Sequence, residues 1–319
     1  MSNKKETASC PMKKTSIGGQ ALLEGIMMRG PKKSAMAVRK PDGEMVVEVT
    51  DLKHADRKGF LKWPVVRGVV GFVDSMVVGY QAMMRSAELS GFEEQEEQSK
   101  FDRFLTEKLG EKLYSVIGII AGVLGVAIAV CLFVFVPTWI VKLFNTYVFS
   151  LGIFTSVAEG IIKIAVFIAY IALVALMPDI RRTYEYHGAE HKTIACYEAL
   201  EEITPENAAK HSRFHPRCGT SFILIILILS ILLFLLVPAE LDILYRFGLR
   251  IVLLPLTVGI GYEIIKLVGR HDNRFTRIIS APGLWLQRLT TREPDEKQLE
   301  IAIAALKAVM PKDKDEAKW

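Results

Sequence analysis

Residues 114–136 read YSVIGIIAGVLGVAIAVCLFVFV, without a single charged side chain. A helix of about 20 consecutive apolar residues is long enough to cross the hydrocarbon core of a bilayer. Residues 220–237, TSFILIILILSILLFLLV, have the same character. Two further apolar stretches, residues 151–177 and 247–268, carry a few charged side chains. The sequence therefore predicts a mainly α-helical, polytopic membrane protein with about four transmembrane helices.

The charged residues lie outside these stretches and predict an orientation. The chain is 51% hydrophobic and 24% charged, so the two classes must be segregated. Lysine and arginine are frequent in residues 1–112, 178–219 and 269–319, whereas the short loops at 142–150 and 238–246 hold few. Positively charged loops stay on the cytoplasmic side. Both termini are therefore expected in the cytoplasm, and the N-terminus shows no cleavable signal peptide. We expect a multi-pass protein of the cell (cytoplasmic) membrane.

This orientation divides the chain into three parts. Residues 1–112 form an α+β cytoplasmic N-terminal region, residues 113–268 a four-helix transmembrane bundle with a cytoplasmic His-rich loop at 178–219, and residues 269–319 a cytoplasmic helical tail. Within the tail, a helix is expected over residues 295–310, where apolar residues recur at helical spacing on one face.

The N-terminal region contains signals for both strands and a helix. Residues 34–38 and 45–49 read as two strands around the turn Lys40-Pro41-Asp42-Gly43-Glu44. The glycine-rich segment 18–31 precedes them, either as a lead into the sheet or as a backbone that approaches a ligand closely. Residues 63–87 are amphipathic, and they fit either an interfacial helix or a segment that re-enters the membrane.

A five-residue motif, His187-Gly188-Ala189-Glu190-His191, follows the second apolar stretch. In a helix, positions i, i+3 and i+4 share one face, so both imidazoles and the carboxylate would point the same way. Two imidazoles at this spacing suit zinc or another divalent transition metal, and the carboxylate would act as a general base on bound water. The same H-x-x-E-H order occurs in the inverzincin metallopeptidases.

Further ligand candidates converge on the same side of the membrane. His215 and Cys218 lie just before the third apolar stretch, at a spacing that can chelate a metal. A set of His187, His191, His215 and Cys218 would make a closed structural zinc site, whereas fewer ligands would leave a catalytic position open. Glu263, His271 and Asp272 are candidates for an additional ligand or for groups that orient the ligands.

Charge and cysteine usage narrow the range of partners. The net charge of +5 favours contact with anionic lipid head groups and is too small to indicate nucleic acid. The four cysteines are expected in the cytoplasm or within the membrane, so no disulfide is predicted. Glu159 and Lys163 lie four residues apart inside an apolar stretch, where an ion pair facing the bundle interior is expected.

Four longer motifs carry a family resemblance: GGQALLEGIMMRGP from Gly18, YHGAEHKTIACYE from Tyr186, HPRCGTSF from His215, and GRHDNRFTRIISAPGLWLQRLTTREP from Gly269. In this order they resemble the bacterial YqhQ family of multi-span membrane proteins, a domain of unknown function described as predicted metal-dependent enzymes. The resemblance covers about residues 17–306. It implies functional positions at His187, Glu190, His191, His215 and Cys218, and at His271 and Asp272.

Two classes of function fit these observations. The first is a metal-dependent enzyme, such as a hydrolase, that works at the cytoplasmic membrane face on a membrane protein or a lipid-linked molecule. The second is a non-enzymatic membrane scaffold or a membrane-protein biogenesis factor with a structural metal site. A transporter is a less favoured third hypothesis. Its only support is the presence of two ionisable residues, Glu159 and Lys163, inside an apolar stretch.

Overall fold

The computed structural model describes residues 15–52, 59–91, 112–237, 241–271 and 273–311. These fall into two compact units. The first, called the sheet unit here, comprises Met1–Gly91, Val174–Ile226 and Val258–Trp319; the second, called the apolar unit, comprises Phe92–Leu173 and Leu227–Thr257. Helices α8 (Gly219–Phe234) and α9 (Ile243–Arg270) each contribute several residues to both units.

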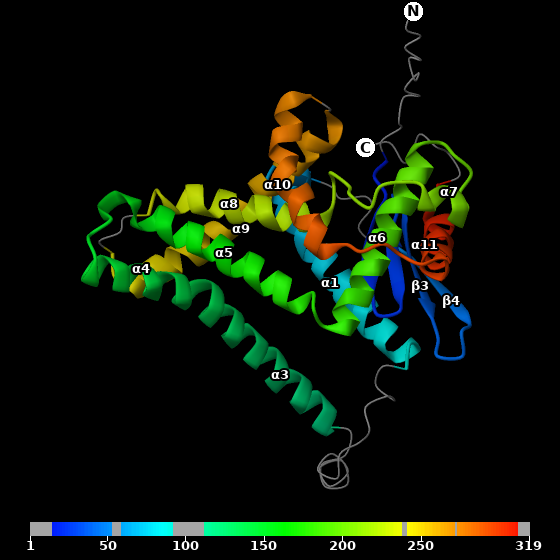
Figure 1. Ribbon diagram of the computed structural model, residues 1–319, viewed down its shortest axis with the longest axis horizontal. Coiled ribbons are helices and arrows are strands. Elements are labelled where there is room, and N and C mark those ends of the chain that lie inside the picture. The colour runs from blue at the N-terminus through cyan, green and yellow to red at the C-terminus, as the bar shows by residue number, and fades with distance from the viewer. Residues whose placement is uncertain (1–14, 53–58, 92–111, 238–240, 272, 312–319) are drawn as a thin grey trace, which may run out of the picture. The chain divides into compact units, whose positions relative to one another are not determined.

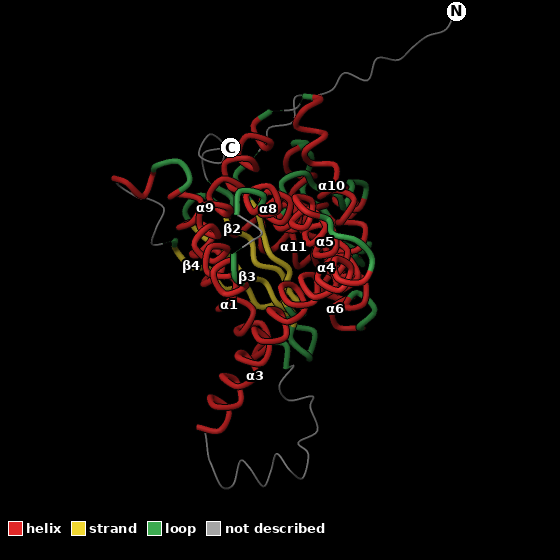
Figure 2. The backbone as a smooth tube through the Cα atoms, turned by 90° about the vertical axis from the view of Figure 1, so that its left-hand side faces the viewer, coloured by secondary structure: helices red, strands yellow, loops and turns green. Residues whose placement is uncertain are grey.

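The sheet unit is built on a four-stranded antiparallel sheet in the order β1-β2-β3-β4. The strands are β1 (Gly18–Leu22), β2 (Gly25–Arg29), β3 (Lys33–Arg39) and β4 (Met45–Asp51), and Figure 2 shows them as yellow tubes. The predicted hairpin is present as β3 and β4, with Arg39 opposite Met45 across the turn. The glycine-rich segment forms β1 and β2, so it belongs to the sheet itself.

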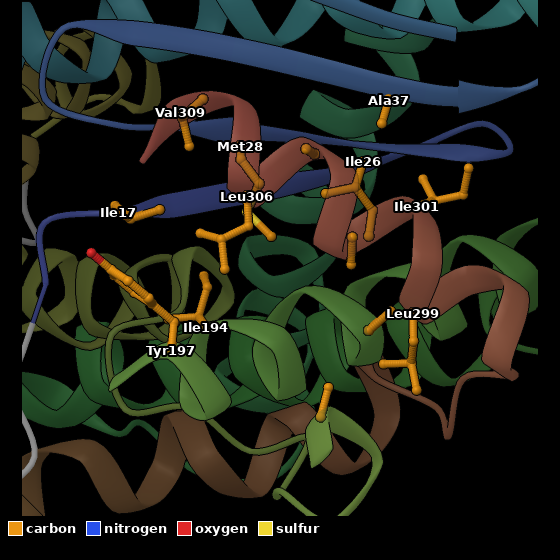
Figure 3. Close-up of a cluster of buried hydrophobic side chains, with 14 of the residues drawn as sticks. Ile17, Ile26, Met28, Ala37, Ile194, Tyr197, Leu299, Ile301, Leu306 and Val309 are labelled. Atoms are coloured by element: carbon orange, nitrogen blue, oxygen red, sulfur yellow. The ribbon is translucent and has the colours of Figure 1, made fainter. Parts of the chain in front are cut away.

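Both faces of the two central strands are covered by helices. Alternate residues of β2 and β3 pack with helices α6 (Pro178–Glu198) and α11 (Glu296–Val309), which lie beside the sheet in Figure 1. Figure 3 shows this core, in which Ile26 and Met28 of the sheet lie near Leu306 of α11. The opposite face packs on α1 (Val66–Leu89) through a second cluster that includes Met27 and Met36. Covering on both sides explains the nearly continuous apolar runs in β2 and β3.

The helices expected in the C-terminal tail and in the N-terminal region are both present. The segment 295–310 forms α11, which begins with a capping box between Asp295 and Gln298. The segment 63–87 forms most of α1, whose inner face packs on the sheet. Its outer face exposes an apolar stripe at helical spacing: Val73, Met76, Val77, Tyr80 and Met84.

The turn between β1 and β2 is held by helix α6. Glu24 has a positive φ of 50° in this turn, a conformation that is uncommon for residues other than glycine and asparagine. Its carboxylate forms an ion pair with Arg182 and accepts a hydrogen bond of 3.1 Å from the Tyr186 hydroxyl. These contacts with α6 compensate for the unfavourable backbone conformation.

The apolar unit consists of long hydrophobic helices. Helix α3 (Lys112–Val130) continues through a π-helical turn, η2 (Cys131–Phe135), into α4 (Val136–Tyr147), and α5 (Thr155–Val174) follows after η3 (Gly152–Phe154). Three helices are long and apolar enough to cross a membrane: Gly122–Tyr147, Thr155–Val174 and Leu244–Arg270. Helix α8 is also apolar but shorter, with 16 residues. The prediction of apolar helices typical of a membrane protein is thus confirmed, while their number as spans stays a prediction.

Glu159 in the apolar unit does not form the ion pair with Lys163 that the sequence predicts. Its carboxylate lies 3.2 Å from Arg246 and 2.5 Å from Arg250, both on α9. Lys163 lies instead over the ring of Phe234, 5.6 Å from the centroid. The ion pairs therefore join α5 to α9, and the expected pair within α5 is absent from the described contacts.

Candidate metal centre

Helix α6 carries the H-x-x-E-H motif. Pro178 occupies its first turn, where a proline interrupts no helical hydrogen bond. From Tyr186 onward most side chains are buried, because β1, α11 and the segment after α6 pack around this part of the helix. Residues 178–219, the His-rich segment between two apolar stretches, contain α6, the short helix α7 (Pro205–Ala209) and the connections that follow them.

Three side chains bring ligand atoms together beside α6. One nitrogen or sulfur atom from each of His187, His191 and Cys218 lies within 4.8 Å of the other two. Nε2 of His187 is 3.1 Å from Sγ of Cys218, and the two imidazole centroids are 4.4 Å apart. His191 and Cys218 are only 1% and 6% exposed. Two imidazoles and one thiol in such proximity form a donor set suited to zinc.

The second ring nitrogen of each histidine is fixed by the backbone. Nδ1 of His187 lies 2.8 Å from the carbonyl oxygen of Thr290, and Nδ1 of His191 lies 2.6 Å from that of Arg213. A carbonyl oxygen only accepts, so each Nδ1 carries the proton. Metal-binding histidines characteristically make this contact, which leaves Nε2 to bind the metal. Nε2 of His191 is buried and has no hydrogen-bond partner among the described residues, and a bound ion would satisfy it.

The electrostatics of the three side chains favour a thiolate. Burial alone would raise the pKa of the Cys218 thiol, but attraction to His187 and His191 outweighs this and holds the pKa well below its usual value. Burial also disfavours protonated His187, yet the charge of Cys218 and the hydrogen bond to it raise the pKa of His187 to about 9. Cys218 is therefore in the form in which cysteine binds metals.

Glu190 lies beside this cluster and against strand β1. Its carboxyl group is buried, and burial raises its pKa even though His191 and His187 act in the opposite direction. A Cβ atom at Gly19 would lie 2.9 Å from Glu190 Cδ, so the approach of β1 to this carboxylate requires a glycine. Gly19 also lines an open cavity of about 390 Å³, together with Gly18, Gln20 and Ser75. Gly19 is therefore next to the Glu190 carboxylate and also lines this cavity.

His215 lies next to the cluster, but its ring nitrogen faces other partners. Its centroid is 5.5 Å from that of His191, while its Nε2 lies 3.3 Å from Arg217 and 3.9 Å from Glu198. Gln287 fixes the His215 backbone through two hydrogen bonds. Burial would raise the pKa of Glu198, but the nearby His215 imidazole and the paired Arg217 guanidinium lower it to about 2. His215 is therefore placed beside the cluster, and His187, His191 and Cys218 form the candidate donor set.

The remaining sequence candidates have other surroundings. Glu263 forms an ion pair with Arg67 of α1, whose Nε donates a hydrogen bond of 2.7 Å. His271 is exposed, and its Nδ1 donates to the carbonyl oxygen of Leu267. Asp272 lies outside the described residues. Neither Glu263 nor His271 joins the described three-residue cluster.

A second group of ligand-type side chains is explained by ordinary contacts. Cys196, Glu201 and His211 lie close enough to share an ion. His211 is already paired with Glu201 at 3.2 Å, and the Cys196 thiol donates to the carbonyl oxygen of Glu202. Burial raises the pKa of Cys196, which disfavours the thiolate that a metal would need. This group is therefore a weaker donor set than the cluster on α6.

Comparison with known proteins places the chain in a family. Residues 63–312 match the family model described as "Protein of unknown function (DUF1385)". This chain belongs to the DUF1385 family. It is 33% identical over 297 residues to the "Uncharacterized protein YqhQ" of Bacillus subtilis (strain 168), with 92% of each chain covered. The resemblance to the YqhQ family seen in the sequence motifs is confirmed. No solved structure matches this DUF1385 protein.

The H-x-x-E-H motif of this DUF1385 protein contains a glycine that packing requires. A Cβ atom at Gly188 would lie 2.0 Å from the carbonyl oxygen of Arg292, where the chain after α10 (Arg274–Thr290) passes α6. Arg292 also donates a backbone hydrogen bond of 2.8 Å to Tyr184. Any larger residue at position 188 must push this segment away, and Thr290, the backbone partner of His187, lies just before it.

Gly188→Ala is therefore expected to lower the free energy of unfolding by about 1–3 kcal/mol, the usual cost of overpacking. This loss should exceed the gain of up to about 1 kcal/mol that alanine brings to a helix. Denaturation of the detergent-solubilised chain measures the change. Gly125→Ala is the matched control, because a Cβ atom there would meet no atom within 4 Å. Equal stability of both variants would contradict the close approach at Gly188.

Proposed function

We propose that this protein is an integral membrane, metal-dependent hydrolase with its H-x-x-E-H site at the cytoplasmic face of the membrane. One observation carries the proposal: Nε2 of His187, Nε2 of His191 and Sγ of Cys218 converge, while both Nδ1 atoms are held by backbone carbonyl groups. Hydrogen bonds of this kind orient imidazoles for a metal. Zinc, or another divalent transition ion, fits two nitrogens and one thiolate.

The number of ligands supports a catalytic site over a structural one. Structural zinc sites have four protein ligands, whereas catalytic sites have three and keep a fourth position for water or substrate. His215, the candidate for a fourth ligand, faces Glu198 and Arg217. His187, His191 and Cys218 would therefore hold the ion and leave a fourth position open.

The residues around a bound ion would have separate roles in hydrolysis. A bound metal would activate a water molecule and polarise the bond to be cleaved. Glu190, on the same helix face as both imidazoles, would accept a proton from the attacking water and pass it to the leaving group. Thr290 and Arg213 would keep both imidazoles in the tautomer that presents Nε2. The substrate would be a membrane-protein segment or a lipid-linked molecule.

The membrane setting is supported by helix composition and charge. Three described helices can cross a bilayer, and α8 supplies a fourth, shorter apolar helix. Lysine and arginine flank these helices on the sides that place both termini in the cytoplasm. Cys218 directly precedes α8 in the chain, so the site would lie at a membrane surface. The exposed apolar stripe on α1 would rest on the bilayer of the bacterial inner membrane.

Substitution of the ion by cobalt tests the open position. The purified full chain is loaded with Co²⁺ in detergent, and its absorption spectrum is recorded with and without acetohydroxamate. We expect a near-ultraviolet thiolate-to-cobalt band that Cys218→Ser removes, and visible bands that shift when acetohydroxamate binds. A cobalt spectrum that acetohydroxamate leaves unchanged would contradict the enzyme and favour a structural site.

A non-enzymatic scaffold or biogenesis factor is the second candidate. It is favoured by the way in which the cluster joins three separate segments, since it links α6 to residues 213–218 and to the end of α10. A metal there would pin these segments together and stabilise a surface for partner proteins. The cobalt spectrum separates the two candidates, because a structural ion has no position for an added ligand.

A further inference from the structure

The apolar unit contains an unusual concentration of charge. Glu159 on α5 is 6% exposed and contacts Arg246 and Arg250 of α9, whose side chains are 12% and 15% exposed. Lys163 follows Glu159 by one turn of α5 and lines the same small cavity as Glu159 and Arg250. Charged side chains among membrane-spanning helices are costly and usually mark a functional site.

The described charges in this cluster do not balance. Arg246, Arg250 and Lys163 supply three cationic groups, and Glu159 is the one carboxylate that the structure places among them. Of the described residues, none accepts from the buried Nε atoms of Arg246 and Arg250. Lys163 contacts the Phe234 ring without forming an ion pair within the described segments. Cations that are largely shielded from solvent need a partner, so a further anion would complete the cluster.

A second cavity, of about 150 Å³, extends from the same arginines. Its walls include the apolar side chains of Val134, Phe135, Leu244 and Phe247. Thr138, Arg246 and Arg250 complete its lining. Both cavities also share Thr138 and Val134. A mainly apolar recess that two arginines also line matches a ligand with a hydrocarbon chain and an anionic phosphate.

We infer that the apolar unit binds an anionic phospholipid, with the head-group phosphate on Arg246, Arg250 and Lys163 and an acyl chain along Val134 and Phe247. Guanidinium groups hold phosphate through paired hydrogen bonds. Basic pockets between membrane helices bind lipid head groups in this way. The apolar lining favours a lipid over a soluble anion, because inorganic phosphate would leave that surface unfilled. The inference goes beyond the metal site and does not depend on it.

Native mass spectrometry of the detergent-purified full chain tests this site. Phosphatidylglycerol and phosphatidylcholine are titrated separately, and bound lipid is counted per chain. We expect one tightly held phosphatidylglycerol, with phosphatidylcholine bound at least about tenfold more weakly, as the loss of a charge-assisted contact implies. Lys163→Gln and Arg250→Gln should each remove this preference. Arg270→Gln is the matched control, because Arg270 is an exposed arginine at the other end of α9.

Two further measurements keep the test decisive. Lys163→Gln leaves both ion pairs of Glu159 intact, so it removes one positive charge with little risk to folding. Thr138→Leu keeps every charge but fills part of both cavities, and it should weaken lipid binding. Displacement of the lipid by millimolar inorganic phosphate would overturn the lipid assignment in favour of a soluble anion. Equal binding of both lipids, or an equal effect of Arg270→Gln, would overturn the site.

Discussion

Replacing both His187 and His191 with alanine should reduce bound metal from about one ion per chain to less than about one tenth of that. The substitution removes two of three ligands, and Cys218 alone cannot retain an ion at micromolar protein concentration. Structural zinc binding in small domains is worth about 10–16 kcal/mol. Elemental mass spectrometry of the detergent-purified chain, prepared without chelator, measures this content.

The matched control removes two histidines elsewhere. His211→Ala/His271→Ala deletes the histidine of the second ligand-type group and the exposed histidine at the end of α9. It should keep the full metal content, and both double variants should elute as folded chains in size-exclusion chromatography. Loss of metal from the control alone would move the site away from α6. An absence of metal from the unaltered chain, even after reconstitution, would rule out the metal centre.

The N-terminal sheet illustrates what sequence patterns capture. The β3–β4 hairpin was predictable because Pro41, Asp42 and Gly43 are standard turn residues. The β1–β2 hairpin turns at Leu23 and Glu24, which carry no such signal. The unfavourable positive φ of Glu24 is compensated by contacts of its carboxylate with Arg182 and Tyr186 of α6, more than 150 residues away in the chain. A pattern within a few neighbouring residues cannot predict a contact between residues so far apart in the chain.

The same distinction applies to the candidate metal centre. The i, i+4 spacing of His187 and His191 predicts a shared helix face, and the structure brings Cys218 to it. Spacing also grouped His215 with Cys218, but the His215 ring faces Glu198, while Gln287 fixes its backbone. No sequence pattern predicts which backbone carbonyl groups orient the two imidazoles. Side-chain direction in irregular segments depends on such distant partners, which hydropathy and spacing do not encode.

Replacing Glu190 with glutamine should abolish hydrolysis while leaving the metal in place. The amide has nearly the same shape as the carboxylate and can still accept a hydrogen bond from the Gly19 backbone, so β1 and α6 keep their contact. An amide cannot take a proton from water, and loss of a general base typically costs a factor of about 10²–10⁴ in rate. Unchanged metal content together with lost turnover would separate proton transfer from metal binding.

Labelled water makes turnover measurable before the substrate is known. The reconstituted protein is incubated with bacterial membranes in H₂¹⁸O, and mass spectrometry follows ¹⁸O incorporation, since hydrolysis transfers one water oxygen to a product. Glu185→Gln is the matched control, because Glu185 lies on α6 but accepts a hydrogen bond from Gln298 and is outside the cluster. We expect incorporation with this control and almost none with Glu190→Gln.

Full incorporation with Glu190→Gln would assign the proton transfer to another group. No incorporation with the unaltered, metal-loaded protein would favour the structural role, in which the metal joins α6 to its neighbours.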